Sequence, residues 1–250
     1  MPFPIARKTE LISVNAEQMK EVDRLMESKY GIRSIQMMEN AGKSLARLSR
    51  ELFLENSAKF KNVMVLAGSG GNGGGALVCA RHLANYGAKV QVAISCPADF
   101  LSDLPLHQLR ILKKMGIEVK EANTLKMPKI NFDLVIDGLI GYSLRGNPKA
   151  GAAKLIDWAN SQNAPILSLD VPSGVDVGNG EIYEPAIKAA ATMTLALPKQ
   201  GLFDVTARPN IGRLFLADIS VPPQLYAEKP LELIVQPIFS EGDILEIKIQ

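Results

Sequence analysis

Cysteine and histidine are scarce in this chain of 250 residues, with two of each. Two thiols cannot build the disulfide framework of a small secreted domain, so we expect a reducing compartment and a cytoplasmic protein. Histidine, cysteine and carboxylate residues nowhere cluster with the spacing of a transition-metal site. The sequence therefore gives no reason to expect zinc-type chemistry.

Long apolar runs and an excess of one charge are also missing. No segment approaches the roughly 20 apolar residues of a membrane span, and residues 1–8 lack the apolar stretch of a signal peptide. The formal net charge is only +2, without a dense run of lysine and arginine. We expect neither a membrane nor a nucleic-acid partner.

The remaining composition is that of an ordinary globular protein, with 47% hydrophobic and 22% charged residues. Two amphipathic helices are expected first, and apolar strands then alternate with helices, which predicts a mostly parallel sheet with helices on both faces. The expected helices cover 15–29, 35–54, 73–86, 104–115, 150–161 and 184–189. The expected strands cover 63–67, 89–94, 118–119, 132–136, 165–169, 192–197 and 214–219.

A proline pair at 222–223 ends this alternation. We expect one domain over residues 1–223, followed by residues 224–250 as a C-terminal extension without an assigned role. Two apolar segments in the extension, 231–238 and 244–249, could form a hairpin or a contact between two copies of the chain. The sequence does not decide between these alternatives.

Between the first expected strand and its helix lies a segment with six glycines in eight residues, 68–75. A helix N-terminus presents free backbone N–H groups to an anion, and glycine lets the backbone approach a phosphate closely. The pattern Gly68-x-Gly70-x-x-Gly73 matches the dinucleotide fingerprint, but no acidic residue ends the next strand to hold a ribose. This absence counts against an ordinary nicotinamide dehydrogenase, and a turn without a ligand remains an alternative.

Polar residues also follow three later strands. They are Asp137, Asp170 with Ser173, and Lys199. Each has an ordinary explanation in isolation, since Asp-Gly and Asp-x-Pro are common turns and lysine is usually a surface charge. Because ligands of open parallel sheets bind at the carboxyl ends of the strands, we expect these residues to converge.

Five segments in order resemble the NAD(P)H-hydrate epimerase family, the YjeF N-terminal-type domain, from about residue 17 to 222. They are 37–42 (MMENAG), 68–77 (GSGGNGGGAL), 135–141 (VIDGLIG), 168–174 (SLDVPSG) and 197–202 (LPKQGL). The resemblance implies a Rossmann-like three-layer αβα sandwich with two N-terminal helices. It also implies an isomerase that interconverts the C6 epimers of hydrated NADH and NADPH, in repair of these cofactors.

Site residues follow from the same resemblance. It implies a monovalent cation, typically K⁺, held by Asn72, Asp137 and Ser173, and a reacting centre at Asp170 and Lys199. A substrate groove is implied along two segments and Asp170. Its residues are Gly71, Asn72, Gly73, Gly74, Gly75, Gly141, Tyr142, Ser143, Leu144, Arg145, Gly146 and Asn147.

The implied chemistry suits these residues. The ring nitrogen can expel the C6 hydroxyl as water, which leaves a planar iminium ion open to water on either face. We expect the Asp170 carboxyl to protonate the leaving hydroxyl and to deprotonate the entering water, with Lys199 orienting it. A separate dehydratase specific for one epimer would complete the repair.

The glycine segment departs from the family pattern Gly-Asn-Asn-Gly-Gly-Asp-Gly, because Gly71 replaces its first asparagine and Gly75 its aspartate. Ala190 also stands where members often carry an acid. One interpretation is a branch that binds the same ligand differently, and another is altered or lost activity. A non-catalytic nucleotide-binding or protein-interaction member of the fold is the alternative function.

Overall fold

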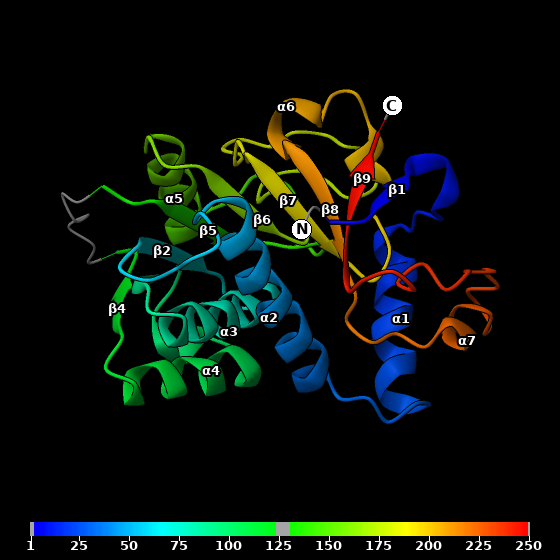
Figure 1. Ribbon diagram of the computed structural model, residues 1–250, viewed down its shortest axis with the longest axis horizontal. Coiled ribbons are helices and arrows are strands. Elements are labelled where there is room, and N and C mark those ends of the chain that lie inside the picture. Colours follow the sequence, from blue (N-terminus) through cyan, green and yellow to red (C-terminus); the bar gives the residue numbers. More distant parts are fainter. Residues whose placement is uncertain (1–2, 124–130, 250) are drawn as a thin grey trace.

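The computed structural model describes residues 3–123 and 131–249, and its strands form one mostly parallel sheet (Figure 1). The strand order is β1-β9-β8-β7-β6-β5-β2-β3-β4, and the β8–β9 pair is antiparallel. The strands are β1 (Ile5–Arg7), β2 (Asn62–Ala67), β3 (Lys89–Ile94), β4 (Glu118–Glu121), β5 (Leu134–Gly138), β6 (Ile166–Leu169), β7 (Ala191–Leu195), β8 (Arg213–Ala217) and β9 (Ile244–Lys248).

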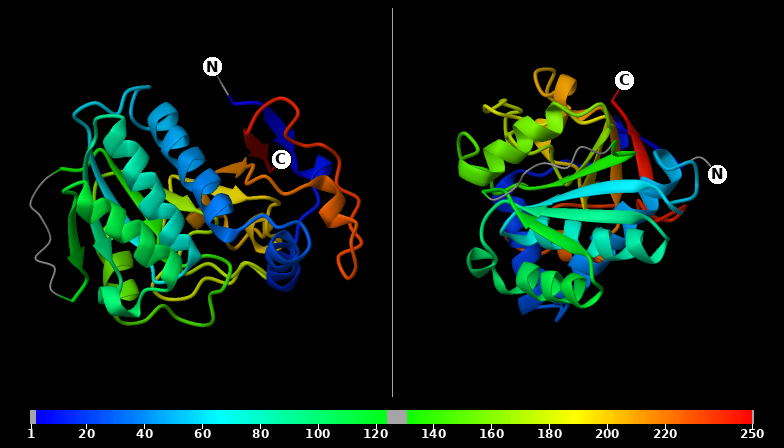
Figure 2. Two further views of the ribbon diagram at one scale, coloured as in Figure 1. Left: turned by 90° about the horizontal axis from the view of Figure 1, so that it is seen from below. Right: turned by 90° about the vertical axis from the view of Figure 1, so that its left-hand side faces the viewer.

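Helices cover both faces of the sheet (Figure 2). Helices α2, α3 and α4 lie on one face and α5 lies on the other, while α1 stands beyond the carboxyl ends of β7 and β8 (Figure 1). The helices are α1 (Ala16–Ser28), α2 (Ser34–Leu52), α3 (Gly71–Asn85), α4 (Asp103–Lys114), α5 (Ala150–Asn160), α6 (Arg208–Ile211) and α7 (Pro223–Tyr226), with 3₁₀ turns at Lys8–Glu10, Ala98–Phe100 and Gln200–Phe203. None of these helices has the length and apolarity needed to cross a membrane.

Alternation along the central strand β2 divides its side chains between two cores. Val63, Val65 and Ala67 pack with α2, α3 and α4, whereas Met64 and Leu66 pack on the α5 side. Successive side chains of a strand point to opposite faces, so a strand buried on both sides is apolar throughout. This confirms the predicted α/β sandwich.

The prediction of a helix at 184–189 is wrong, because the structure has no helix there. Backbone groups of this segment are engaged elsewhere: the N–H of Ile187 donates to the carbonyl of Ser173 at 2.8 Å, and that of Ala189 to the carbonyl of Asn210 at 2.9 Å. These bonds to distant parts of the chain replace the hydrogen bonds of a helix.

The C-terminal segment contributes to the sheet instead of forming a hairpin. Ile244–Lys248 inserts between β8 and β1, whereas residues 231–238 contain no strand. The short strand β1, which the sequence did not suggest, pairs in parallel with β9. Both ends of the described chain therefore meet at one edge of the sheet, and a contact between two copies stays a prediction.

Candidate functional site

A cavity of about 540 Å³ opens at the carboxyl ends of the parallel strands. Its volume lies within the range of small-molecule sites. Its walls come from α1, α2, the start of α4, the glycine segment and the segments at or after the ends of β5, β6, β7 and β8. The lining residues are Met19, Asp23, Ser34, Met37, Met38, Ala41, Ser69, Gly70, Gly71, Asn72, Gly75, Leu104, Leu139, Ile140, Gly141, Tyr142, Ser143, Leu169, Asp170, Leu195, Lys199 and Ile219.

Most of the glycine segment is the first turn of α3 and not a loop before it. Gly70 is the N-cap and the helix begins at Gly71. A Cβ at either position would meet nothing within 4 Å, whereas a Cβ at Gly73 would lie 1.9 Å from the carbonyl oxygen of Gly68. Glycine at position 73 thus permits close packing of strand and helix. Glycine at positions 70 and 71 leaves open space for an anion in front of the backbone N–H groups of the first helical turn.

Gly75, where the family pattern has an aspartate, borders the cavity beside Leu169. A Cβ on Gly75 would lie 2.8 Å from Cδ2 of Leu169. The leucine side chain therefore occupies the space into which a side chain at position 75 would extend. Gly73 and Gly74 lie outside the cavity lining, and a Cβ at Gly74 would collide with the side chain of Met38.

Asp170 and Lys199 form a buried ion pair at the bottom of this cavity. The Lys199 Nζ lies 2.5 Å from the Asp170 Oδ1, and the side chains of Lys199 and Asp170 are 1% and 6% exposed respectively. The lysine ammonium also donates to the carbonyl of Leu195 at 2.9 Å and to Oγ1 of Thr194 at 3.3 Å. Charge pairing and these hydrogen bonds compensate for the loss of water around the ammonium group.

Asp170 has a left-handed backbone, with φ of 66°. Residues other than glycine rarely adopt this conformation, although aspartate tolerates it better than most. The N–H of Asp170 donates to the carbonyl of Met193 at 2.7 Å, and the N–H of Val171 to that of Leu169 at 2.8 Å. The turn after β6 is therefore held in a conformation that directs the carboxylate toward Lys199.

Asp137 lies behind the cavity wall with both carboxylate oxygens occupied. Oδ1 accepts from the Ser173 hydroxyl at 2.6 Å and from the N–H of Leu139 at 3.2 Å. Oδ2 accepts from the Ser168 hydroxyl at 2.8 Å and from the N–H of Ser173 at 2.9 Å. Burial raises the pKa of this carboxyl group, against the opposing effect of the four donors.

Asn72 reaches the same region from the first turn of α3. A Cβ on Gly141 would lie 3.3 Å from its Cγ and 3.2 Å from Oδ2 of Asp170, so the three residues adjoin one another. The amide nitrogen Nδ2 of Asn72 is buried without a hydrogen-bond partner. Asn72 therefore lies beside Gly141 and Asp170, while Asp137 and Ser173 are hydrogen-bonded to each other.

The structure divides the segment 141–147. Gly141, Tyr142 and Ser143 line the cavity, whereas Leu144, Arg145, Gly146 and Asn147 lie outside its lining. Asn147 instead accepts a hydrogen bond from the N–H of Glu184 at 3.2 Å. The substrate contacts expected of these four residues stay a prediction.

Sequence reasoning missed the contribution of the two N-terminal helices to the cavity. Helix α1 supplies Met19 and Asp23, and α2 supplies Met37 and Met38. A signal was present in α1, because Asp23 follows Met19 by four residues and precedes Met26 by three, on the apolar face of an amphipathic helix. A carboxylate in that position needs a polar environment inside the fold.

Comparison with known proteins finds relatives that align with most of this chain. The NAD(P)H-hydrate epimerase of Dehalogenimonas lykanthroporepellens is 39% identical over 96% of this chain and 95% of its own length. That of Lentilactobacillus buchneri is 34% identical over 84% of this chain and 94% of its length. The Bifunctional NAD(P)H-hydrate repair enzyme Nnr of Moorella thermoacetica is 34% identical over 86% of this chain, which spans only 41% of that protein.

The crystal structure of the yeast protein YNL200c matches 94% of this chain and 100% of its own, with a TM-score of 0.75 and 27% identity. The family described as YjeF-related protein N-terminus matches residues 34–201, which include the glycine segment, Asp137, Asp170 and Lys199. The chain therefore belongs to this family of YjeF-related N-terminal domains.

Proposed function

We propose that the protein interconverts the C6 epimers of hydrated NADH and NADPH. The observation that carries this proposal is the buried Asp170–Lys199 pair, which faces a cavity next to the free N-terminus of α3. Relatives that align over nearly their whole length are named NAD(P)H-hydrate epimerase. A buried ion pair adds little net stability, so its place beside the cavity favours a role in catalysis.

The chemistry requires proton transfer beside a developing cation. The ring nitrogen expels the C6 hydroxyl, which leaves as water once it has gained a proton, and water then adds to the iminium ion. Asp170 is the acid/base group of this proposal, and its negative charge also stabilises the cationic ring. Lys199 fixes the carboxylate in place, and the N–H groups at the start of α3 bind the substrate's phosphates.

The oxygen donors beside the cavity suit a monovalent cation, for which we propose K⁺. The carboxylate of Asp137, the hydroxyl of Ser173 and the side-chain amide of Asn72 are hard ligands. The unpartnered amide nitrogen of Asn72 supports this assignment, because exchanging the amide nitrogen and oxygen by a flip of the group would bring the oxygen to the same place. A bound cation would neutralise Asp137 and fix the segments that contact the substrate.

The cation assignment is tested by comparing the protein in K⁺ and in a K⁺-free tetramethylammonium buffer of equal ionic strength. We expect K⁺ to raise the melting temperature of the wild type, because an ion that binds only the folded state stabilises it. The Asn72→Ala variant should lose most of this increase. Equal melting temperatures of the wild type in both buffers would contradict the cation assignment without touching the epimerase proposal.

Asp170→Asn tests the assignment of the reacting carboxylate. We expect epimerisation to fall about 10²–10⁴-fold, which is the usual contribution of one acid/base group. Asparagine tolerates the left-handed backbone of this position and cannot transfer the proton. The control is Asp157→Asn on the exposed side of α5, which should keep the wild-type rate. An Asp170→Asn variant with wild-type activity would contradict the assignment.

For the product, we propose consumption by a dehydratase. Relatives described as bifunctional repair enzymes extend well beyond the region matched here, which supports a second repair activity acting next to this one. A pure epimerase only equilibrates its two substrates, so the repair needs a further reaction that removes water.

A further inference from the structure

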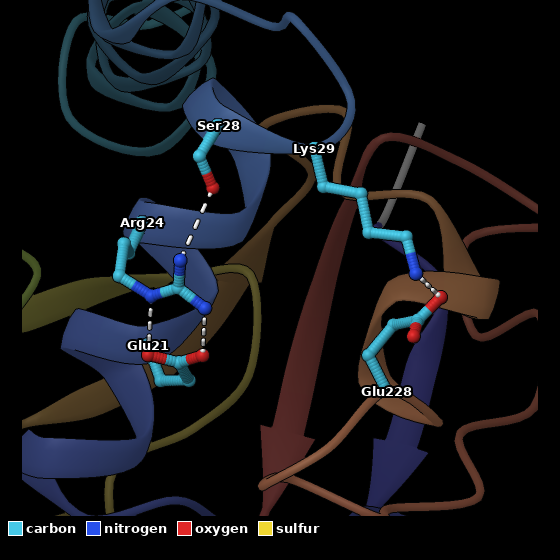
Figure 3. Close-up of polar contacts among 5 residues, drawn as sticks. All are labelled: Glu21, Arg24, Ser28, Lys29 and Glu228. Atoms are coloured by element: carbon cyan, nitrogen blue, oxygen red, sulfur yellow. Dashed lines mark hydrogen bonds and ion pairs between the residues drawn. The ribbon is translucent and has the colours of Figure 1, made fainter.

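Asp23 is the one carboxylate of α1 among the residues that line the cavity. Glu17 pairs with Lys20 and Glu21 pairs with Arg24, both at 2.6 Å. Figure 3 shows Arg24 between Glu21 and Ser28, and the Arg24 side chain is 58% exposed. Asp23 lies among the lining residues of the cavity, together with Asp170 and Lys199.

Asp23 is held by a residue from a distant part of the chain. Its Oδ2 accepts a hydrogen bond from the hydroxyl of Tyr142 at 2.6 Å. Tyr142 follows Gly141, whose Cα adjoins the Asp170 carboxylate. Burial raises the pKa of Asp23, while the Tyr142 hydrogen bond and the positive charge of Lys199 oppose this rise and the negative charges of Asp170 and Glu27 add to it. The Asp23 carboxyl group therefore belongs to the same charged site as Asp170.

Helix α1 lies across the carboxyl ends of the strands, and contacts with distant parts of the chain hold both its N-terminal and its C-terminal side. At its start, the N–H of Val14 donates to the carbonyl of Pro198 at 2.9 Å, and the N–H of Gln200 to that of Val14 at 3.0 Å. At its end, the Lys29 Nζ lies 2.6 Å from the Glu228 Oε1 (Figure 3). These contacts hold α1, which carries Asp23, beyond the carboxyl ends of the strands after which Asp170 and Lys199 follow (Figure 1).

We propose that Asp23 is the second proton-transfer group of the reaction and serves the face of the substrate ring that Asp170 does not reach. This inference rests on the proposed epimerase function. Epimerisation needs water to leave from one face of the ring and to add from the other. A planar ring bound between α1 and the turn after β6 presents one face to each carboxyl group.

The step balances without a further reactant. For one epimer, the Asp23 carboxyl group gives its proton to the C6 hydroxyl, the C–O bond breaks and the nitrogen lone pair forms the C=N bond. Water then forms a C–O bond on the other face, the nitrogen regains its lone pair, and the extra proton of the added water passes to the Asp170 carboxylate. The opposite epimer reverses the two roles, and exchange of protons with solvent restores the starting state.

The test measures oxygen exchange and epimerisation together. Each purified epimer is incubated in H₂¹⁸O with wild type, Asp23→Asn or Asp170→Asn, and spontaneous rates are subtracted. Label and configuration are followed by chromatography with mass detection. The amide oxygen introduced by Asp23→Asn can still accept the Tyr142 hydrogen bond, so the fold is retained. Glu21→Gln is the matched control, because it removes a carboxylate two residues away on the outer side of the same helix.

We expect Asp23→Asn to lose at least about 100-fold in epimerisation. It should still exchange the hydroxyl oxygen of one epimer with retention, because Asp170 can remove and return water on its own face. Asp170→Asn should show the same behaviour with the other epimer, and Glu21→Gln should match wild type.

Two results would overturn the inference. One is epimerisation by Asp23→Asn within about threefold of wild type, and the other is an equal fall of exchange and epimerisation for both epimers. A wild type that accelerates neither process would refute the proposed function itself and the inference with it.

Discussion

At the scale of single residues, the site is dominated by charges removed from water. Lys199 is among the largest fully buried side chains described, and the side chains of Lys199 and Asp170 are only 1% and 6% exposed. A buried ion pair adds little net stability, but removal of one partner leaves an uncompensated charge in the interior. The Asp170–Lys199 pair is thus better explained by the reaction than by stability.

Lys199→Met should lower the free energy of unfolding by about 3–5 kcal/mol, because it leaves the Asp170 carboxylate buried without its cation. The double variant Asp170→Asn, Lys199→Met should recover a large part of this loss. Urea denaturation of the wild type, both single variants and the double variant measures the coupling. If the two single effects simply add, the residues are not energetically paired.

The convergence of polar residues at the strand ends could be predicted, because it follows from their position after apolar strands of a parallel sheet. Asp137, Asp170 and Lys199 each come at or just after the end of an apolar strand, and the structure brings them to one edge of the sheet. Asp23 could not be assigned in the same way. Its role depends on where α1 packs, and that placement is set by contacts with Pro198, Gln200 and Glu228, far along the chain.

At the scale of elements, the crossing of α2 and α3 determines the shape of one cavity wall. A Cβ on Gly42 of α2 would lie 2.4 Å from Cβ of Val78 and 2.6 Å from the carbonyl oxygen of Gly75. Glycine is therefore needed for the two helices to approach this closely. The close approach brings Met37 and Met38 to the cavity beside the first turn of α3.

Gly42→Ala should destabilise the protein by about 1–3 kcal/mol, the usual cost of overpacking a core. Gly71→Ala is the matched control for stability, since a Cβ there meets nothing within 4 Å and alanine favours a helix. Its free energy of unfolding in urea should stay unchanged or rise slightly. Equal stability of Gly42→Ala and wild type would show that the two helices can separate without cost.

Helices were predicted correctly where the apolar periodicity of the segment itself determines the structure. The prediction failed where hydrogen bonds to distant segments determine it. The expected helices at 15–29 and 104–115 match α1 and α4 within about one residue at each end. The segment 184–189 has a pattern that fits a helix, but its backbone bonds to Ser173 and Asn210. Strand β1, only three residues long, has too short a pattern to be recognised.

At the scale of the whole molecule, strand order explains where the cavity lies. From β2 the chain runs outward to β3 and β4, then returns to place β5 on the other side of β2. Such a reversal opens a crevice at the carboxyl ends of the two central strands. The first turn of α3, after β2, and the segment after β5 line the cavity at this point.

Strand alternation predicted a parallel sheet, but it could not predict the antiparallel β9 or its pairing with β1. The pairing of β1 with β9 joins segments from opposite ends of the chain. On β9, Glu246 accepts from Arg213 of the neighbouring strand at 3.0 Å and from Lys248 at 2.7 Å. These contacts extend the sheet at the edge far from the glycine segment, so they support the fold without entering the site.

The most direct test of the central claim starts from one purified C6 epimer of hydrated NADPH. Its conversion to the other epimer is followed by NMR with and without the wild-type protein. The account predicts that a catalytic amount of protein brings the epimers to equilibrium far faster than the spontaneous reaction. Interconversion at the spontaneous rate, with protein that is folded and saturated with K⁺, would contradict it.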